Sequence, residues 1–422
     1  MIVRRTSAAA VAIMVTTLLL GVASAGASTA SSGSSSGSSS GAGRAQPAPD
    51  GLPDFYAVPS KIPSKPGALI KSEKVKAPEI DGTVYRVMYV SESETGKPVP
   101  VTGIVVIPDG DAPRGGFPVL GIAHGTTGMA DDCAPSLDPA DSPETTNAVL
   151  QRGYAIAATD YQGLGTPGLH PYIAGKTAAR NTVDNVRAAR ELADGDVGKD
   201  YVVWGHSQGG HTAMHADQLG PEYAPDLELH GVVAGAPPSQ FNLIYDFLKT
   251  SDFRHYLLMA AGGLNEAYGD KAAPLDEVLT PEGIDLIPEL EKGCSGDLQD
   301  QLTGVDFDTV TKADPFEVPA WKTILTAEDP QSFDTPSDVP LLIIHGGNDE
   351  QIPTASSAIL SEHLCGIDQS LVRWVYPGTS HAGVIPPSLG DMLTWIDHRF
   401  ADEPNPDQYA PTGQPDVEIT RC

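Results

Sequence analysis

The pentapeptide Gly205-His206-Ser207-Gln208-Gly209 determines how this chain is interpreted. It follows residues 200–204, a β-branched and aromatic run that predicts a buried strand, and it precedes residues 210–216, which predict a helix. A G-x-S-x-G pattern between a strand and a helix is typical of a turn so tight that its flanking residues must lack bulk. Such a turn lifts the serine hydroxyl above the edge of the sheet. The sequence therefore predicts Ser207 as a nucleophile.

A serine hydroxyl is a weak nucleophile near neutral pH, so it needs a base that is oriented by an acid. Residues 339–345 and 371–376 each predict a strand, and Asp349 and His381 follow these strands directly. Both side chains are expected at the sheet edge where Ser207 is exposed. The order Ser, Asp, His is that of an α/β-hydrolase. Glu350 is a neighbouring rival for the acid.

Other histidines are weaker candidates for the base. His211 lies four residues after Ser207 but is expected to point along the helix rather than over the hydroxyl. His124 and His345 each lie at a strand end and are expected to be structural. His381 alone combines a position after the last predicted strand with small flanking residues.

An oxyanion hole requires two backbone N–H groups aimed at the developing negative charge. The residue after the nucleophile, Gln208, is expected to supply one. The second is expected from the loop after the strand at 117–123, where Gly125 and Thr126 are both candidates. An ordinary glycine-rich turn is the alternative interpretation of this loop.

The remaining pattern predicts an α/β fold with a mostly parallel central sheet flanked by helices. Further strands are predicted at 83–90, 99–107, 117–123, 154–160 and 231–235, with a helix at 178–192. Between residues 239 and 337 the alternation stops, and helical stretches are predicted at 241–259, 282–291 and 297–302. We interpret 239–337 as a helical cap or lid between the sixth and seventh predicted strands. The core would then comprise residues 50–238 and 338–422.

The N-terminal 49 residues have the composition of export and linker segments. Residues 1–27 combine Arg4 and Arg5, an apolar stretch and small residues suited to cleavage, which predicts a signal peptide and an extracellular protein. Residues 28–49 are rich in Ser and Gly and predict a flexible linker. No transmembrane segment is expected in the mature chain, and a monomer is expected.

The charge and the cysteines narrow the class further. A formal net charge of −29 argues against nucleic acid and anionic membrane surfaces as partners. Four cysteines in an exported chain (Cys133, Cys294, Cys365 and Cys422) predict two disulfides, with three pairings open. Their spacing fits neither zinc nor a C-x-x-C redox pair, so no metal is expected.

Four motifs carry a resemblance to a known family. They are Gly205-His206-Ser207-Gln208-Gly209, Asp132-Cys133-Ala134-Pro135-Ser136, His345-Gly346-Gly347-Asn348-Asp349 and Gly378-Thr379-Ser380-His381. In this order and spacing the chain from about residue 50 to 422 resembles the secretory lipase family typified by Candida antarctica lipase A, within the α/β-hydrolase superfamily.

The resemblance implies a secreted enzyme with a large cap that cleaves triacylglycerols and simpler esters without a cofactor. It implies Ser207, Asp349 and His381 as the triad, and bridges that join Cys133 to Cys294 and Cys365 to Cys422. Family members can carry an acidic residue where this chain has His124-Gly125, so the second oxyanion donor stays open.

The sequence thus predicts a secreted carboxylic ester hydrolase, in the first place a lipase, which acts on a lipid or small ester through an acyl-enzyme. One alternative is an exported serine peptidase of the aminopeptidase type. Such an enzyme needs carboxylates to hold a free amine, and the predicted cap offers Asp246, Asp252, Glu266 and Asp270. A non-catalytic binding protein on the same fold is the other alternative.

Overall fold

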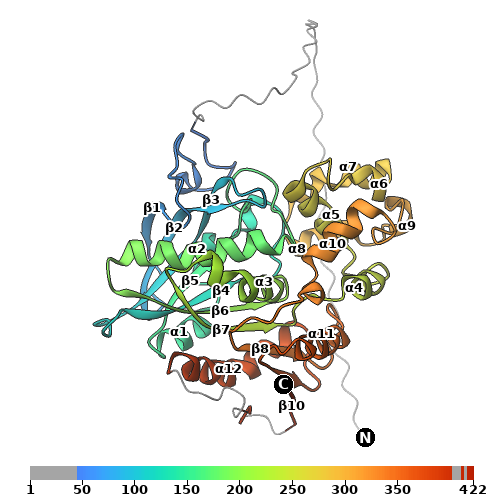
Figure 1. The fold of residues 1–422 in the computed structure, drawn as a ribbon. Coiled ribbons are helices and arrows are strands. Elements are labelled where there is room, and N and C mark those ends of the chain that lie inside the picture. Colours follow the sequence, from blue (N-terminus) through green and yellow to red (C-terminus); the bar gives the residue numbers. More distant parts are fainter. Residues whose placement is uncertain (1–44, 402–409, 413–415) are drawn as a thin grey trace, which may run out of the picture. The chain divides into compact units, whose positions relative to one another are not determined.

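A ten-stranded mixed sheet forms the centre of the chain in the computed structural model, which describes residues 45–401, 410–412 and 416–422 (Figure 1). The strands lie in the order β1-β2-β3-β5-β4-β6-β7-β8-β9-β10. Their bounds are β1 Leu69–Val75, β2 Gly82–Glu92, β3 Pro98–Pro108, β4 Phe117–Ala123, β5 Ala155–Thr159, β6 Val197–His206, β7 Glu228–Gly235, β8 Leu341–Gly346, β9 Leu371–Tyr376 and β10 Glu418–Arg421.

The six neighbouring strands β5, β4, β6, β7, β8 and β9 are parallel, which agrees with the predicted parallel centre of the sheet. Antiparallel pairing joins β1 to β2, β2 to β3, β3 to β5 and β9 to β10. All residues of β8 and β9 are buried, as expected for parallel strands that are covered on both faces. The parallel centre places the carboxyl ends of β6, β8 and β9 at one edge.

Helices cover both faces of this sheet (Figure 1). One face packs against α2 Gly175–Ala193, α3 Gln208–Tyr223 and α11 Thr354–Gly366. The other packs against α1 Pro143–Leu150 and α12 Ile385–Phe400. Successive residues of β6 divide between the two layers: Val203 faces α2 and α3, whereas Val202 faces α1 and α12. The architecture is the predicted α/β fold.

Seven α-helices follow β7 and precede β8 in the described chain. They are α4 Phe241–Leu248, α5 His255–Tyr268, α6 Leu275–Val278, α7 Pro281–Leu286, α8 Ser295–Leu302, α9 Phe307–Val310 and α10 Pro319–Glu328. We call this segment, residues 241–328, the inserted helices. They contribute most of one hydrophobic cluster, in which Met259, Leu264 and Trp321 are buried.

The prediction of one helical stretch over 241–259 is wrong, because the chain turns between α4 and α5. The Ser251 hydroxyl accepts a hydrogen bond from the backbone N–H of Phe253 and donates one to the carbonyl of Leu248. A side chain that bonds nearby backbone groups competes with helix continuation. Two edge strands were also not predicted: β1, whose centre is polar, and β10, which has four residues.

The predicted signal peptide and most of the predicted linker lie outside the described residues. Within the linker as predicted, Gln46 forms a β-bridge with Val58, and each residue donates its backbone N–H to the other at 2.9 Å. Regular pairing therefore begins before residue 50. Within the described ranges, every helix is too short or too polar to cross a bilayer.

Two disulfides hold segments that are distant in sequence. Cys133 pairs with Cys294, joining the loop after β4 to the start of α8, and Cys365 pairs with Cys422, joining the end of α11 to the C-terminus. These are the bridges that the family resemblance implies. Beside the first bridge, the backbone N–H of Ser295 donates to the carbonyl of Thr127 at 2.8 Å. The loop after β4 is thus bonded directly to the inserted helices.

Candidate active site

Ser207 lies at the junction of β6 and α3 with a backbone conformation that few non-glycine residues adopt, φ 60° and ψ −121°. Such a conformation costs roughly 1–3 kcal/mol and persists only where surrounding contacts fix it. The backbone N–H of Ser207 donates to Gly235 of β7 at 2.9 Å, and its carbonyl accepts from His211 at 3.0 Å. Strand, turn and helix therefore hold Ser207 in the predicted elbow.

The two glycines of the pentapeptide make this turn possible. A Cβ at Gly205 would lie 2.1 Å from the carbonyl oxygen of Gly209, and a Cβ at Gly209 would lie 1.9 Å from that of Ala123. Both distances are far below van der Waals contact. The G-x-S-x-G pattern is therefore a steric requirement of the turn in this chain.

Asp349 and His381 meet at the same edge, at the ends of β8 and β9. Oδ2 of Asp349 accepts a hydrogen bond from Nδ1 of the His381 ring at 2.7 Å. The ring of His381 lies beside that of His206, the residue before the nucleophile, with 4.6 Å between ring centroids. With Nδ1 bound to Asp349, Nε2 is the nitrogen left to accept a proton.

The rival acid, Glu350, makes a different contact. Its Oε2 accepts the backbone N–H of His381 at 3.0 Å, so it holds the main chain of the loop. In this geometry Asp349 contacts the imidazole and Glu350 positions the segment that carries it.

The environment of Asp349 favours its ionised form. Its side chain is fully buried, and burial alone would raise its pKa. Hydrogen bonds from His345 and His381 outweigh burial and hold the pKa of Asp349 well below its usual range. Oδ1 also accepts from the backbone N–H groups of Gln351 and Ile352, at 2.9 and 2.8 Å.

The loop after β4 lies against the nucleophile. A Cβ at Gly125 would lie 3.3 Å from the carbonyl oxygen of His206 and 3.7 Å from Cβ of Ser207, so a side chain here would pack against the serine. The ring of His124 lies between the carbonyl oxygens of Gly125 and Asp160, at 2.6 and 3.1 Å. Because the C=O and N–H of a trans peptide point in opposite directions, this contact directs the Thr126 N–H away from the His124 ring.

The side chains of His170 and Tyr172 contact Gln208 and Thr126, two of the predicted oxyanion-hole residues. The Gln208 amide donates to Nε2 of His170 at 2.7 Å, and Nδ1 of His170 donates to the carbonyl of Gln162 at 2.8 Å. Burial lowers the pKa of His170 to about 3, so this imidazole stays neutral as an acceptor. The Thr126 and Tyr172 hydroxyls lie 2.8 Å apart. His170 and Tyr172 were not predicted, because they lie in an irregular loop without a recognisable motif.

An apolar cavity, about 970 Å³ when the space open to solvent is included, extends from Ser207 into the inserted helices. The residues that line it share an apolar or uncharged side chain: Tyr172, Ile173, Ser207, Pro238, Phe241, Ile244, Tyr245, Leu248, Tyr256, Leu257, Leu258, Ala260, Ala261, Leu264, Val278, Leu279, Phe307, Thr311, Ala313, Pro315, Phe316, Trp321, Leu325 and Ile352.

The predicted cap residues divide between this cavity and the surface. Phe241, Ile244 and Leu248 line the cavity on one side of α4. Leu243 and Phe247, on the other side, are 36% and 38% exposed and do not line it. The helical period of α4 thus selects which apolar residues face the cavity.

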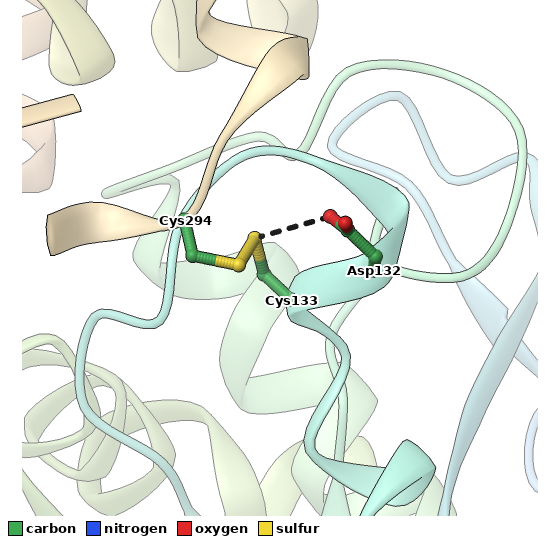
Figure 2. Close-up of side chains that lie close together, drawn as sticks. All are labelled: Asp132, Cys133 and Cys294. Carbon is green, nitrogen blue, oxygen red and sulfur yellow. Dashed lines mark hydrogen bonds between the residues drawn. A yellow bond between two sulfur atoms is a disulfide. The ribbon is translucent and has the colours of Figure 1, made fainter. Parts of the chain in front are cut away.

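Three groups of described residues bring metal-ligating atoms together. Figure 2 shows Asp132 beside the Cys133–Cys294 bridge, with Oδ1 3.8 Å from Sγ of Cys133. A disulfide sulfur carries neither a proton nor thiolate charge, so this is a close approach rather than a ligand set.

In the second group, Nε2 of His211 and of His215 lie 2.7 and 3.1 Å from the carbonyl oxygen of Glu328. Burial lowers the pKa of His211 to about 3 and that of His215 to about 4. Two neutral imidazoles that donate to one carbonyl explain this contact. It joins the helix after the nucleophile to the end of α10.

In the third group, Nε2 of His230 contacts Oδ1 of Asp200 at 2.9 Å, and Glu228 forms an ion pair with Lys199.

Comparison with known proteins identifies the family of this chain. A model of the secretory lipase family matches residues 144–408, a range that contains Ser207, Asp349 and His381. The chain belongs to the secretory lipase family. The resemblance seen in the sequence motifs is thereby confirmed.

This secretory lipase has relatives of low identity but broad coverage. It is 25% identical over 336 residues to the secreted triacylglycerol lipase LIP4 of Malassezia globosa, covering 75% of this chain and 72% of that protein. It is 24% identical over 354 residues to lipase A of Moesziomyces aphidis, covering 78% and 75%. It is also 24% identical over 390 residues to a probable inactive lipase of Mycobacterium tuberculosis, covering 86% and 85%.

Solved structures show the same fold. Candida antarctica lipase A in its closed state has a TM-score of 0.71 and 21% identity, covering 84% of this secretory lipase and 86% of that chain. The rice cell wall degrading esterase LipA of Xanthomonas oryzae, in a ligand-bound form, has a TM-score of 0.65 and 17% identity, covering 80% and 97%. The secretory family and its secreted relatives support an extracellular location, with which two disulfides agree.

Proposed function

We propose that this secretory lipase hydrolyses carboxylic esters with medium or long acyl chains, triacylglycerols among them, through an acyl-enzyme on Ser207. The observation that carries the proposal is the position of Ser207 in the wall of a cavity lined almost entirely by apolar side chains. Each methylene that an acyl chain buries there contributes about 0.8 kcal/mol. The family and its relatives named as triacylglycerol lipases support the same substrate class.

In the first half of the reaction, Oγ of Ser207 bonds to the ester carbonyl carbon while Nε2 of His381 takes the hydroxyl proton. The carbonyl oxygen becomes an oxyanion. Backbone N–H groups of Gln208 and of Gly125 or Thr126 stabilise this charge. When the tetrahedral intermediate collapses, the ester C–O bond breaks and His381 returns its proton to the departing alcohol.

In the second half, water replaces Ser207. His381 removes a proton from water, the oxygen attacks the acyl carbon, and the Ser207 Oγ–carbon bond breaks as Oγ regains its proton. Asp349 stays ionised throughout, because its hydrogen bonds hold its pKa low. It orients His381 and stabilises the imidazolium.

The composition of the cavity weakens the peptidase alternative. An enzyme that binds a free amino group needs a carboxylate near the nucleophile. Among the described residues that line the cavity, none is charged. The four acidic candidates, Asp246, Asp252, Glu266 and Asp270, do not contribute to the wall.

The probable inactive relative makes a non-catalytic binding protein the second alternative. The contact between Asp349 and His381 favours catalysis, because a binding protein gains nothing from an oriented imidazole.

Turnover of p-nitrophenyl esters from acetate to palmitate tests the proposal, with alanyl and prolyl p-nitroanilides beside them and Ser207→Ala as the control. We expect ester hydrolysis that Ser207→Ala abolishes and poor cleavage of the anilides. Faster cleavage of an anilide than of any ester would replace the proposal with the peptidase. No turnover of any substrate would favour a binding protein.

A further inference from the structure

A second buried imidazole, that of His345, lies behind Asp349. His345 is the last residue but one of β8 and is fully buried. Its Nε2 lies 3.2 Å from Oδ2 of Asp349, the same oxygen that accepts from His381. The carbonyl oxygen of Ile352 lies 3.1 Å from the same nitrogen. Because both neighbours only accept hydrogen bonds, Nε2 of His345 carries the proton.

The other ring nitrogen of His345, Nδ1, contacts the hydroxyl of Ser357. Nε of Arg373 donates to Oγ of Ser357 at 2.9 Å, which leaves the Ser357 proton for another acceptor. Nδ1 of His345 lies 2.7 Å from this hydroxyl, nearer than the carbonyl of Thr354 at 3.2 Å. Ser357 therefore donates to Nδ1. One assignment of protons satisfies every group from Arg373 to His381.

We propose that His345 is a positioning residue, which holds Asp349 in place for His381 and lowers the pH above which His381 acts as a base. This inference rests on the roles proposed above for Asp349 and His381. A donor on Oδ2 draws negative charge away from the side that faces His381. The imidazolium of His381 is then stabilised less. Without the contact from His345, the ring would become neutral only at a higher pH.

Other polar groups near the two imidazoles make different contacts. The ring of His206 packs beside that of His381, and Glu350 accepts the His381 backbone N–H. Arg373 contacts Ser357 and Thr354, and Glu418 on β10 acts on Arg373. Of the groups named here, only His345 and His381 have a side-chain nitrogen close to Oδ2 of Asp349, at 3.2 and 2.7 Å.

Two substitutions at His345 distinguish the loss of a hydrogen-bond donor from the loss of the ring. His345→Leu removes the donor, whereas the amide nitrogen of His345→Gln can occupy the position of Nε2 and donate to Asp349. For His345→Leu we expect the midpoint of the acid limb of kcat/KM to rise by about half to one pH unit. We also expect the plateau to fall about ten- to a hundred-fold. His345→Gln should restore the midpoint.

A matched pair on α11 decides the question even where His345→Leu does not fold. Ser357 and Ser361 are both buried and one turn apart, and Ser361 donates to the Ser357 carbonyl at 2.7 Å without reaching His345. Ser357→Ala removes the donor to Nδ1 and should shift the acid limb upward. Ser361→Ala should lower the melting temperature similarly and leave the pH profile unchanged.

A readout that needs no turnover separates this inference from the proposed function. The ring signals of His381, followed by NMR against pH, should titrate at higher pH in Ser357→Ala and His345→Leu than in the wild type. Wild type that hydrolyses no ester would refute the proposed function, while the titration would still report on His345. Identical titration midpoints in wild type and both folded variants would overturn the inference.

Discussion

Oδ2 of Asp349 lies 2.7 Å from Nδ1 of His381, and the register of two adjacent parallel strands sets this distance. Gly346 at the end of β8 pairs with Tyr376 at the end of β9. Beyond the strands, the backbone N–H of Asn348 donates to the carbonyl of Thr379 at 2.9 Å. The loops that carry the acid and the imidazole are thus bonded to each other before their side chains meet.

This arrangement predicts unequal effects for the two neighbouring acids. Asp349→Asn should lower kcat roughly 10⁴-fold, because an amide leaves His381 in the wrong tautomer. Ser207→Ala and His381→Ala should each cost as much, with the double variant little worse. Glu350→Gln removes a contact to the His381 backbone and should cost far less. Steady-state kinetics on one ester that found Glu350→Gln crippling and Asp349→Asn mild would reverse the assignment.

The cavity predicts how acyl-chain preference responds to its wall. Ala261 lies on α5 and lines the cavity, so Ala261→Phe should fill space that an acyl chain occupies. At about 0.8 kcal/mol per lost methylene contact, kcat/KM for a long-chain ester should fall by ten-fold or more for each two carbons displaced. The value for acetate should change little.

Leu243→Phe provides the control, because Leu243 is exposed on the opposite side of α4. It adds the same aromatic group outside the cavity and should leave the chain-length profile unchanged. Wild-type activity that collapsed beyond butyrate would show that the inserted helices cover the site without binding the acyl chain.

The two disulfides should differ in their contributions to stability. Loop entropy gives upper values of about 5 kcal/mol for the 161-residue separation of Cys133 and Cys294 and about 4 kcal/mol for the 57-residue separation of Cys365 and Cys422. Paired Cys→Ala variants should therefore both unfold at lower denaturant concentration, the first by more. Non-reducing peptide mapping that linked Cys133 to Cys365 would contradict the pairing itself.

Asp217 predicts a pH-dependent stability that involves no catalytic group. It is buried on α3, and burial raises its pKa to about 7 from 3.8. Because the folded value exceeds the unfolded value, its stabilising contribution is complete below about pH 4 and is lost as the pH rises to about 7. Asp217→Asn does not titrate, so its stability relative to wild type should rise across this window, by about 4 kcal/mol at most.

Denaturant unfolding of wild type and Asp217→Asn at several pH values from 4 to 8 measures this difference. Asp285→Asn, an exposed substitution in α7, supplies the matched control and should show a smaller pH dependence. A difference for Asp217→Asn that stayed constant with pH would show that this carboxyl is ionised in the folded protein throughout.

The sequence predicts the centre of the fold well, because residues close together in the sequence specify each of its elements. Buried parallel strands are apolar runs, and the elbow needs glycines at fixed positions, so Ser207, Asp349 and His381 could be placed at one sheet edge. The edge strand β1 has Lys71, Ser72 and Glu73 at its centre and lacks such a run. The break at Ser251 depends on side-chain hydrogen bonds within an otherwise helical pattern.

Parts of the site depend on contacts between distant segments and could not be predicted in this way. Tyr172 and Ile173 enter the cavity from a loop between β5 and α2, and nothing in their spacing indicates this. His345 was expected to be structural because it ends a strand. Its contact with Asp349 depends on the turn of the chain at residues 346–349, which brings the acid back over the end of β8.

Labelling with a fluorophosphonate, followed by peptide mass spectrometry, tests whether Ser207 is the nucleophile. An activated Ser207 attacks phosphorus and displaces fluoride, which leaves a covalent adduct on Oγ. We predict a single adduct on the peptide that contains Ser207, formed in step with the loss of esterase activity and absent from Ser207→Ala. A folded protein that forms no adduct, or that hydrolyses esters while labelled elsewhere, would contradict the account.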